Sequence, residues 1–266
     1  MLGAIIGDIV GSQYEWQNNK SKDFTLFTGM CHYTDDSLMT LAIAQAFTLR
    51  KGHWRDPDFQ KFVVEKMVEM GRAHQGCSWG KSFYHWFMYN PTPYHSYGNG
   101  AAMRISSVGW ISESEDDVRY FSRLVTEVSH NHPEGIKGAQ ATAACIYLAR
   151  TGKSKEYRKE YVETIFGYNL SRTCDEIRPT YQFDGSCQGT VPESIIAFLE
   201  SIDYEHAIRL SVSLGGDSDT MGAITGAIAE AYYGGVPEHI KQEVLKRLPD
   251  EFIDVMSRFY KKFVKK

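Results

Sequence analysis

Residues 214–235 read LGGDSDTMGAITGAIAEAYYGG, and they show the pattern on which the fold is built. The apolar and small residues recur with the 3.6-residue period of a helix, which we expect over residues 219–233 and which the closing glycine pair would end. Gly222 and Gly226 lie four positions apart, on one face of that helix, and they predict close packing against another helix. Most of the remaining chain has the same period, which is typical of an all-α protein.

The other expected helices follow from this period together with helix start and stop signals. Few stretches alternate as strands do, and no linker, composition shift or repeat of 20–50 residues divides the chain. The sequence therefore predicts a single all-α domain over residues 1–266, a compact orthogonal helical bundle. The expected helices cover residues 2–16, 35–52, 57–71, 100–112, 115–128, 134–152, 155–166, 191–201, 204–213, 219–233 and 238–263, the last with a break around Pro249.

Size, charge and cysteine content exclude several classes of protein. A chain of 266 residues can bury about 73% of the surface that it exposes when unfolded, so it needs no disulfide or folding metal. With 29 Lys+Arg against 33 Asp+Glu, the net charge of −4 does not favour general nucleic-acid binding. The five cysteines are odd in number and lack the spacing of a zinc site. We therefore expect reduced thiols and a cytoplasmic, monomeric protein.

The sequence also argues against contact with a membrane. No segment approaches the ~18 uninterrupted apolar residues of a membrane helix. The first residues lack a basic region, and Asp8 interrupts their apolar run, so we expect neither a signal peptide nor a membrane anchor.

Two acidic motifs, TDD at residues 34–36 and DSDT at residues 217–220, each place two carboxylates and a hydroxyl at an expected helix N-terminus. One carboxylate suffices to cap a helix, and capping alone is one interpretation. A second carboxylate at ~4 Å adds a repulsion of a few kcal/mol, which a divalent cation can offset. These oxygen ligands suit Mg²⁺, Mn²⁺ or Ca²⁺ rather than Zn²⁺. If the motifs meet in space, they predict a central acidic metal cleft.

The first helix carries two further carboxylates. Asp8 and Glu15 are seven residues apart and therefore lie within ~20° of the same helix face. Because they interrupt an otherwise apolar helix, they are either exposed or directed at a polar site. Glu15 is the stronger candidate for the site.

A glycine-rich segment, SYGNGAAMR at residues 96–104, leads into another expected helix. Its backbone N–H groups and the helix dipole could hold a phosphate or diphosphate, although an ordinary turn would have the same composition. The segment HNHPEG at residues 130–135 offers two histidines that could contact a substrate or simply pack at a helix start. The loops expected over residues 90–99 and 167–189 are long enough to be functional.

Taken together and in order, these motifs resemble the ADP-ribosylglycohydrolase family, which includes the dinitrogenase-reductase-activating glycohydrolases and the ADP-ribosyl-acceptor hydrolases. The resemblance covers residues 3–15, 34–36, 96–104, 129–138 and 214–226. It implies an all-α fold with a cleft that holds two Mg²⁺ or Mn²⁺ ions. The metal ligands that it implies are Thr34, Asp35, Asp36, Asp217, Asp219 and Thr220.

The resemblance also implies roles for the other motifs. Glu15 matches an acidic residue that closes the site over the metals and helps to position substrate or water, and either Asp35 or Asp36 could act as the base on that water. His130 matches a histidine on the substrate side, with His132 as a second candidate. The segment that would hold the diphosphate consists of Ser96, Tyr97, Gly98, Asn99 and Gly100.

We therefore expect a metal-dependent hydrolase that releases ADP-ribose from a protein side chain or from an ADP-ribose-containing small molecule. Family analogy favours arginine as the acceptor. Serine-linked ADP-ribose, O-acetyl-ADP-ribose and ADP-ribosylated nucleic acid are alternative substrates, and residues 167–189 are where we expect the difference to lie. A non-catalytic ADP-ribose-binding module and a crystallin-like structural protein are alternatives of another class.

Overall fold

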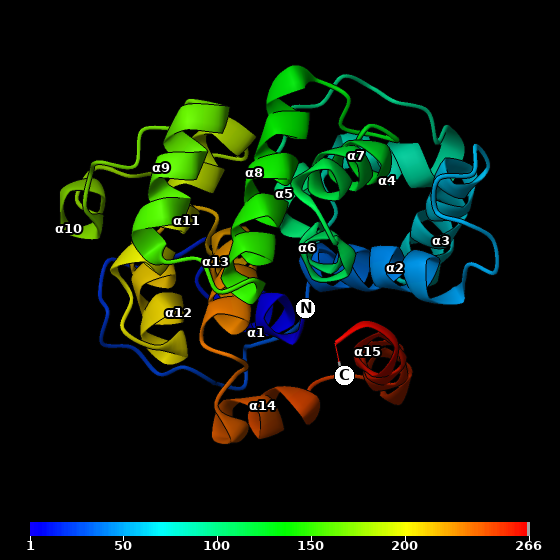
Figure 1. Cartoon of the computed structure of the whole chain (residues 1–266). Coiled ribbons are helices and arrows are strands. Elements are labelled where there is room, and N and C mark those ends of the chain that lie inside the picture. Colours follow the sequence, from blue (N-terminus) through cyan, green and yellow to red (C-terminus); the bar gives the residue numbers. More distant parts are fainter. Residues whose placement is uncertain (265–266) are drawn as a thin grey trace.

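The computed structural model describes residues 1–264, and within this range it contains 15 α-helices and no β-strand (Figure 1). The expected all-α fold is confirmed. An isolated bridge between Gly98 and Ser186 joins two loops. The helices are α1 (Leu2–Ser12), α2 (Asp35–Leu49), α3 (Phe59–Ala73), α4 (Lys81–Tyr89), α5 (Gly100–Met103), α6 (Ser106–Ile111), α7 (Glu115–Thr126), α8 (Pro133–Arg150), α9 (Lys155–Phe166), α10 (Cys174–Ile177), α11 (Cys187–Glu200), α12 (Tyr204–Ser213), α13 (Ser218–Tyr232), α14 (Glu238–Leu245) and α15 (Asp250–Phe263).

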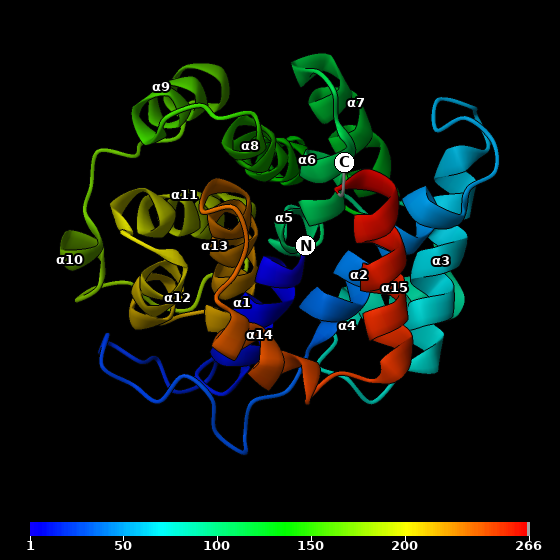
Figure 2. The same ribbon diagram turned by 60° about the horizontal axis from the view of Figure 1, so that its bottom comes forward.

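Helices α1 and α13 pack side by side in the middle of the molecule (Figures 1 and 2). Every residue of α1 is buried, which is why this helix is apolar almost all round. The two backbones touch through glycines: Gly7 faces Gly222, and Gly3 faces Gly226. A Cβ atom at Gly7 would lie 1.9 Å from the carbonyl oxygen of Gly222, so no larger residue fits there. The close packing predicted for Gly222 and Gly226 is therefore confirmed.

Several expected helix boundaries were wrong. Helix α1 ends at Ser12, before the predicted residue 16, and the helix expected over residues 100–112 is divided into α5 and α6 around Arg104. Helix α11 begins at Cys187, four residues before the prediction, because the Ser186 side chain accepts a hydrogen bond from the Gly189 N–H and caps it.

Two helices were missed. The N-cap of α4 is Gly80, which offers no side-chain cap, so this aromatic helix lacks the usual start signal. The short helix α10 lies inside the stretch expected as a loop over residues 167–189. All five cysteines are free thiols. Of the helices in residues 1–264, none has the length and apolar character that crossing a membrane requires.

Candidate active site and metal centre

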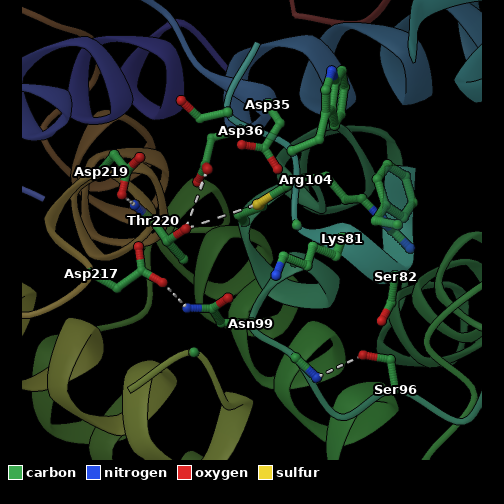
Figure 3. Close-up of a pocket in the computed structure, with 18 of the residues that line it drawn as sticks. Asp35, Asp36, Lys81, Ser82, Ser96, Asn99, Arg104, Asp217, Asp219 and Thr220 are labelled. Carbon is green, nitrogen blue, oxygen red and sulfur yellow. Dashed lines mark hydrogen bonds between the residues drawn. The ribbon is translucent and has the colours of Figure 1, made fainter. Parts of the chain in front are cut away.

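A pocket of about 870 Å³ opens where the N-terminal ends of α2, α4 and α13 meet beside the glycine-rich loop (Figure 3). Figure 3 shows the Asp217 and Asp219 carboxylates on the left of this view and Ser82 and Ser96 on the right. The positive ends of the helix dipoles partly offset the carboxylates at the starts of α2 and α13. The pocket is therefore strongly polar, with its negative charge concentrated on one wall.

The two acidic motifs, which lie far apart in the sequence, meet in this pocket. The hydroxyl of Thr220 donates a hydrogen bond to Asp36 Oδ2 at 3.2 Å, which links α13 to α2. Carboxylate oxygens of Asp8, Asp36 and Asp219 lie within 4.8 Å of one another. A second group, with the same spacing, contains Glu15, Asp217 and Asp219. Asp219 therefore belongs to both groups. We call the residues of the two groups together the acidic cluster: Asp8, Glu15, Asp36, Asp217 and Asp219.

The carboxylates of the acidic cluster are buried and repel one another. Burial raises the pKa values of Asp35, Asp36 and Asp219 well above the usual range, and the neighbouring carboxylates raise them further. Burial, together with Asp217 and Asp8, raises the pKa of Glu15 to about 7, against a smaller opposing effect of a hydrogen bond with Trp16. The buried Oδ1 atom of Asp36 has no hydrogen-bond partner among the described residues. A divalent cation would satisfy this atom and neutralise its neighbours.

Asp8 fixes the start of α2 through four hydrogen bonds. Its Oδ2 atom accepts the backbone N–H groups of Thr34 at 2.9 Å and Ser37 at 3.1 Å, as well as the Ser37 hydroxyl. Its Oδ1 atom accepts the Thr34 hydroxyl at 2.7 Å. Asp8 thus caps α2 from α1 and sets where Asp35 and Asp36 lie. The sequence pattern predicted that Asp8 is either exposed or directed at a polar site. The structure buries it, and its capping partners lie 26 and 29 residues further along the chain, where no local pattern relates them to Asp8.

Replacing Asp8 by asparagine is expected to lower the free energy of unfolding by about 2–4 kcal/mol, because asparagine has a single acceptor oxygen and cannot accept the bonds that both Asp8 oxygens now receive. Urea unfolding followed by circular dichroism measures this change. The matched control is Asp203→Asn at the start of α12, where the side chain caps the single N–H of His206 and asparagine caps equally well. An Asp8→Asn variant as stable as this control would contradict the capping role.

The predicted N-cap of α2 is confirmed at Thr34, whose hydroxyl accepts the Asp36 N–H at 3.3 Å. The same hydroxyl donates to Asp8. Thr34 is not among the residues that line the pocket, so it contacts the acidic cluster without reaching the pocket surface. Asp35, Asp36, Asp217, Asp219, Thr220 and Glu15 all line the pocket. The structure therefore brings together five of the six predicted metal ligands at the pocket surface, with Glu15 beside them.

Asn99 joins the glycine-rich loop to the acidic cluster. Its side-chain amide donates to Asp217 Oδ2 at 2.7 Å and to the Thr190 hydroxyl at 3.2 Å. Its backbone N–H donates to the Gly185 carbonyl at 2.8 Å. The Asn99 side chain is therefore engaged with protein groups and holds Asp217 in place, a contact between residues 118 positions apart that the local sequence could not indicate.

His130 lies against the same loop. The Nη2 atom of Arg104 donates to the Ser129 hydroxyl at 2.7 Å, and that hydroxyl lies 2.8 Å from His130 Nδ1. The Ser129 proton is thus directed to Nδ1, which places the imidazole proton on Nε2. Burial and the nearby Arg104 lower the pKa of His130 well below its usual range, so the ring is neutral. Nε2 faces the glycine-rich loop, since a Cβ atom at Gly100 would lie 3.2 Å from it.

The remaining predicted substrate residues divide into two sets. Ser96, Gly98 and Gly100 line the pocket together with Asn99 and His130. Tyr97 and His132 lie outside the lining and contact each other, with ring centroids 5.4 Å apart. The His132 imidazole caps α8 by accepting the Glu134 N–H at 3.0 Å. Their roles toward a substrate stay predictions.

Sequence reasoning missed one wall of the pocket. This wall comes from the start of α4 and the residues before it, including Trp79 and Lys81, and the missed helix explains why they were not considered. Trp16 and Phe183 also line the pocket. The 167–189 stretch was predicted to be a functional loop, but nothing in the local sequence indicated that Phe183 would reach the pocket.

By its fold and its pocket, this protein belongs to the class of all-α proteins with an acidic, carboxylate-lined cleft. The chain belongs to the ADP-ribosylglycohydrolase family, whose model matches residues 1–266. The resemblance inferred from the motifs is thereby confirmed, and family and relatives indicate an ADP-ribosyl hydrolase.

Two curated relatives and one solved structure illustrate this membership. The chain is 24% identical to the ADP-ribosylhydrolase ARH3 of Homo sapiens, in a match that covers 91% of this chain and 87% of the relative. It is 23% identical to the ADP-ribosylarginine hydrolase Tri1 of Pseudomonas putida, over 96% of this chain and 76% of the relative. A solved structure described as an ADP-ribosylglycohydrolase-related protein complex superimposes with a TM-score of 0.73 at 21% identity, covering 98% of this chain and 95% of its own, and shows the fold.

Proposed function

We propose that this protein is a metal-dependent hydrolase that cleaves the glycosidic bond between ADP-ribose and a protein side chain, with arginine as the acceptor. The observation that carries the proposal is the meeting of two carboxylate groups around Asp219, in a pocket where the buried Asp36 Oδ1 has no partner among the described residues. The similarity to Tri1, an ADP-ribosylarginine hydrolase by name, supports the choice of acceptor.

The residues present fit a pair of Mg²⁺ or Mn²⁺ ions. The donors are carboxylate and hydroxyl oxygens, which both cations prefer, and the unpartnered Asp36 oxygen needs a positive neighbour. When bound, such ions would supply a counter-charge and Lewis acidity toward the ribose hydroxyls and the attacking water. We propose Asp35, Asp36, Asp217, Asp219 and Thr220 as ligands, with Thr34 acting through its bonds to Asp8 and Asp36.

The proposed reaction replaces one bond at the anomeric carbon by another. A bond from the water oxygen to that carbon forms while the bond to the guanidinium nitrogen breaks, through an oxocarbenium-like state. Asp35 or Asp36 accepts the proton that the water loses, and the leaving nitrogen gains one proton, so the reaction is balanced. Glu15 borders the same acidic cluster and positions the water or the ribose.

The ADP-ribose part would lie along the glycine-rich loop. Gly98 and Gly100 line the pocket without a side chain of their own, and the Nε2 of neutral His130 lies 3.5 and 3.2 Å from where their Cβ atoms would be. We also propose that residues 1–266 form a single domain, and that the protein is a monomer that acts in the cytoplasm, as the free thiols favour. Its partners would be ADP-ribosylated proteins or small molecules that contain ADP-ribose.

A panel of substrates tests the proposal. Purified protein with Mg²⁺ is mixed with arginine-linked, serine-linked and nucleic-acid-linked ADP-ribose and with O-acetyl-ADP-ribose, and released ADP-ribose is measured by chromatography. We expect the arginine-linked substrate to have the highest kcat/KM. Tight binding of ADP-ribose without turnover of any substrate would instead indicate a binding module, and neither binding nor turnover would indicate a structural protein.

Removing divalent cations is expected to abolish turnover and to lower the melting temperature. A ligand that binds only the native state at 100 times its Kd stabilises that state by about 2.7 kcal/mol, which calorimetry with and without chelator can detect. Restoring Mg²⁺ should restore both properties. Asp217→Asn should remove the response to Mg²⁺ while its helices persist, and equal melting temperatures with and without Mg²⁺ in the unmutated protein would contradict the metal assignment.

A further inference from the structure

Two large aromatic side chains lie stacked and exposed at the mouth of the pocket. The rings of Trp16 and Phe183 have centroids 5.2 Å apart and planes inclined by 12°. Both line the pocket, yet 77% of Trp16 and 48% of Phe183 is exposed. They come from the loop after α1 and the loop before α11. Exposed aromatic surface that belongs to a pocket is typical of a binding surface rather than of a core.

The loops that carry these rings are tied together by hydrogen bonds. Lys20 Nζ donates to the Tyr181 carbonyl at 2.6 Å, across the two loops. The Asn18 side chain donates to Gln182 Oε1 at 3.3 Å and accepts the Gly216 N–H at 3.1 Å. These contacts join the two loops to the turn that precedes Asp217. The loops that carry the rings are therefore anchored beside the acidic cluster, which lowers the entropic cost of binding against them.

A carboxylate lies next to this aromatic pair. Glu15 precedes Trp16 directly, and its carboxylate groups with Asp217 and Asp219 within 4.8 Å. Within residues 1–264, the cations that lie over aromatic rings are paired with other rings, as Arg104 is with Phe83 and Arg209 with Phe24. The outer faces of Trp16 and Phe183 therefore remain available to a cation. A planar cation would gain the attraction of an aromatic face and that of Glu15, which is not among the proposed metal ligands.

We propose that Trp16 and Phe183 form the acceptor subsite, which binds the guanidinium group of ADP-ribosylated arginine. This inference rests on the proposed function and names the residues that would select its substrate. The guanidinium stacks on the indole of Trp16, while the carboxylate of Glu15 faces its charge. Serine-linked and O-acetyl-linked ADP-ribose carry no planar cation at this position.

Trp16→Ala is the direct test. We expect kcat/KM for an ADP-ribosylarginine peptide to fall about 10-fold, mainly through a higher KM, which corresponds to the loss of one partly desolvated cation–π contact. The affinity for free ADP-ribose, measured by calorimetry, should change less than about twofold, because ADP-ribose lacks the acceptor. Phe183→Ala should show a smaller loss in the same direction, and Trp16→Phe should recover most of the activity.

The matched control is Tyr89→Ala, since Tyr89 is 69% exposed at the end of α4 but lies outside the pocket lining. It should leave every readout unchanged. If Trp16→Ala lost ADP-ribose affinity and turnover equally, the rings would bind the ADP-ribose part of the substrate, and the inference would be overturned. Unchanged kinetics in Trp16→Ala would overturn it as well. If the unmutated protein releases no ADP-ribose from arginine, the proposed function itself fails, and that result is visible before any variant is made.

Discussion

Asp219→Asn is expected to lower kcat/KM about 1,000-fold or more, since each ~1.4 kcal/mol of lost transition-state stabilisation is a factor of ten and a metal centre supplies several kcal/mol. Among residues 1–264, Asp219 alone has a carboxylate in both acidic groups, with Asp8 and Asp36 in one and Glu15 and Asp217 in the other. Its loss should therefore disturb both cation positions at once. Released ADP-ribose from the arginine-linked substrate measures this effect.

The same substitution is expected to stabilise the protein when no metal is bound. Burial and the neighbouring carboxylates raise the pKa of Asp219, so the metal-free protein must either bury this charge or take up a proton, and asparagine avoids that cost. The amide oxygen of asparagine can still accept the Thr220 N–H that Asp219 Oδ1 now accepts at 2.9 Å. Calorimetry of the chelator-treated proteins should thus show a higher melting temperature for the variant and no further rise with Mg²⁺.

Asp250→Asn is the matched control, because Asp250 also lies in the first turn of a helix but is exposed and outside the pocket. Its activity should stay within about twofold of the unmutated protein, as for most surface substitutions. Loss of activity in Asp219→Asn together with a lower metal-free stability would indicate misfolding and would contradict the assignment. Activity above a tenth of the original would contradict it as well.

Patterns that are local in the sequence predicted the structure well. Thr34 caps α2 as expected, because a cap depends on residues two or three positions away. The spacing of Gly222 and Gly226 predicted a close helix contact, although it could not name Gly7 and Gly3 as the partners. A period of 3.6 residues defines the face of a helix, whereas the identity of the partner depends on the whole chain.

The parts of the site that were missed depend on distant contacts. The bond from Asn99 to Asp217 and the bonds from Asp8 to the start of α2 join residues that no local pattern relates. Helix α4, which brings Lys81 to the pocket, begins without a side-chain cap and follows no clear start signal. The sequence motifs thus indicated which chemical groups the site contains, while the shape of the pocket required the fold.

The contact between α1 and α13 determines the spacing of the acidic cluster, since Asp8 follows Gly7 on one helix and Asp219 lies three residues before Gly222 on the other. At Gly7, an added Cβ atom would lie 1.9 Å from the oxygen and 2.2 Å from the carbon of the Gly222 carbonyl. Both are backbone atoms, so relief requires the helices to move apart. A shift of this kind would also separate the carboxylates that the two helices carry.

Gly7→Ala is therefore expected to destabilise the protein by about 3 kcal/mol or more, at or beyond the upper end of overpacking effects in a buried contact. Urea unfolding measures the loss, and the surviving folded fraction should bind Mg²⁺ more weakly. Gly29→Ala is the control, because a Cβ atom there meets nothing within 4 Å and should be neutral or stabilise by up to about 1 kcal/mol. If Gly7→Ala lost less than about 1 kcal/mol, the helices could separate at little cost, and this contact would not be what sets the distance between Asp8 and Asp219.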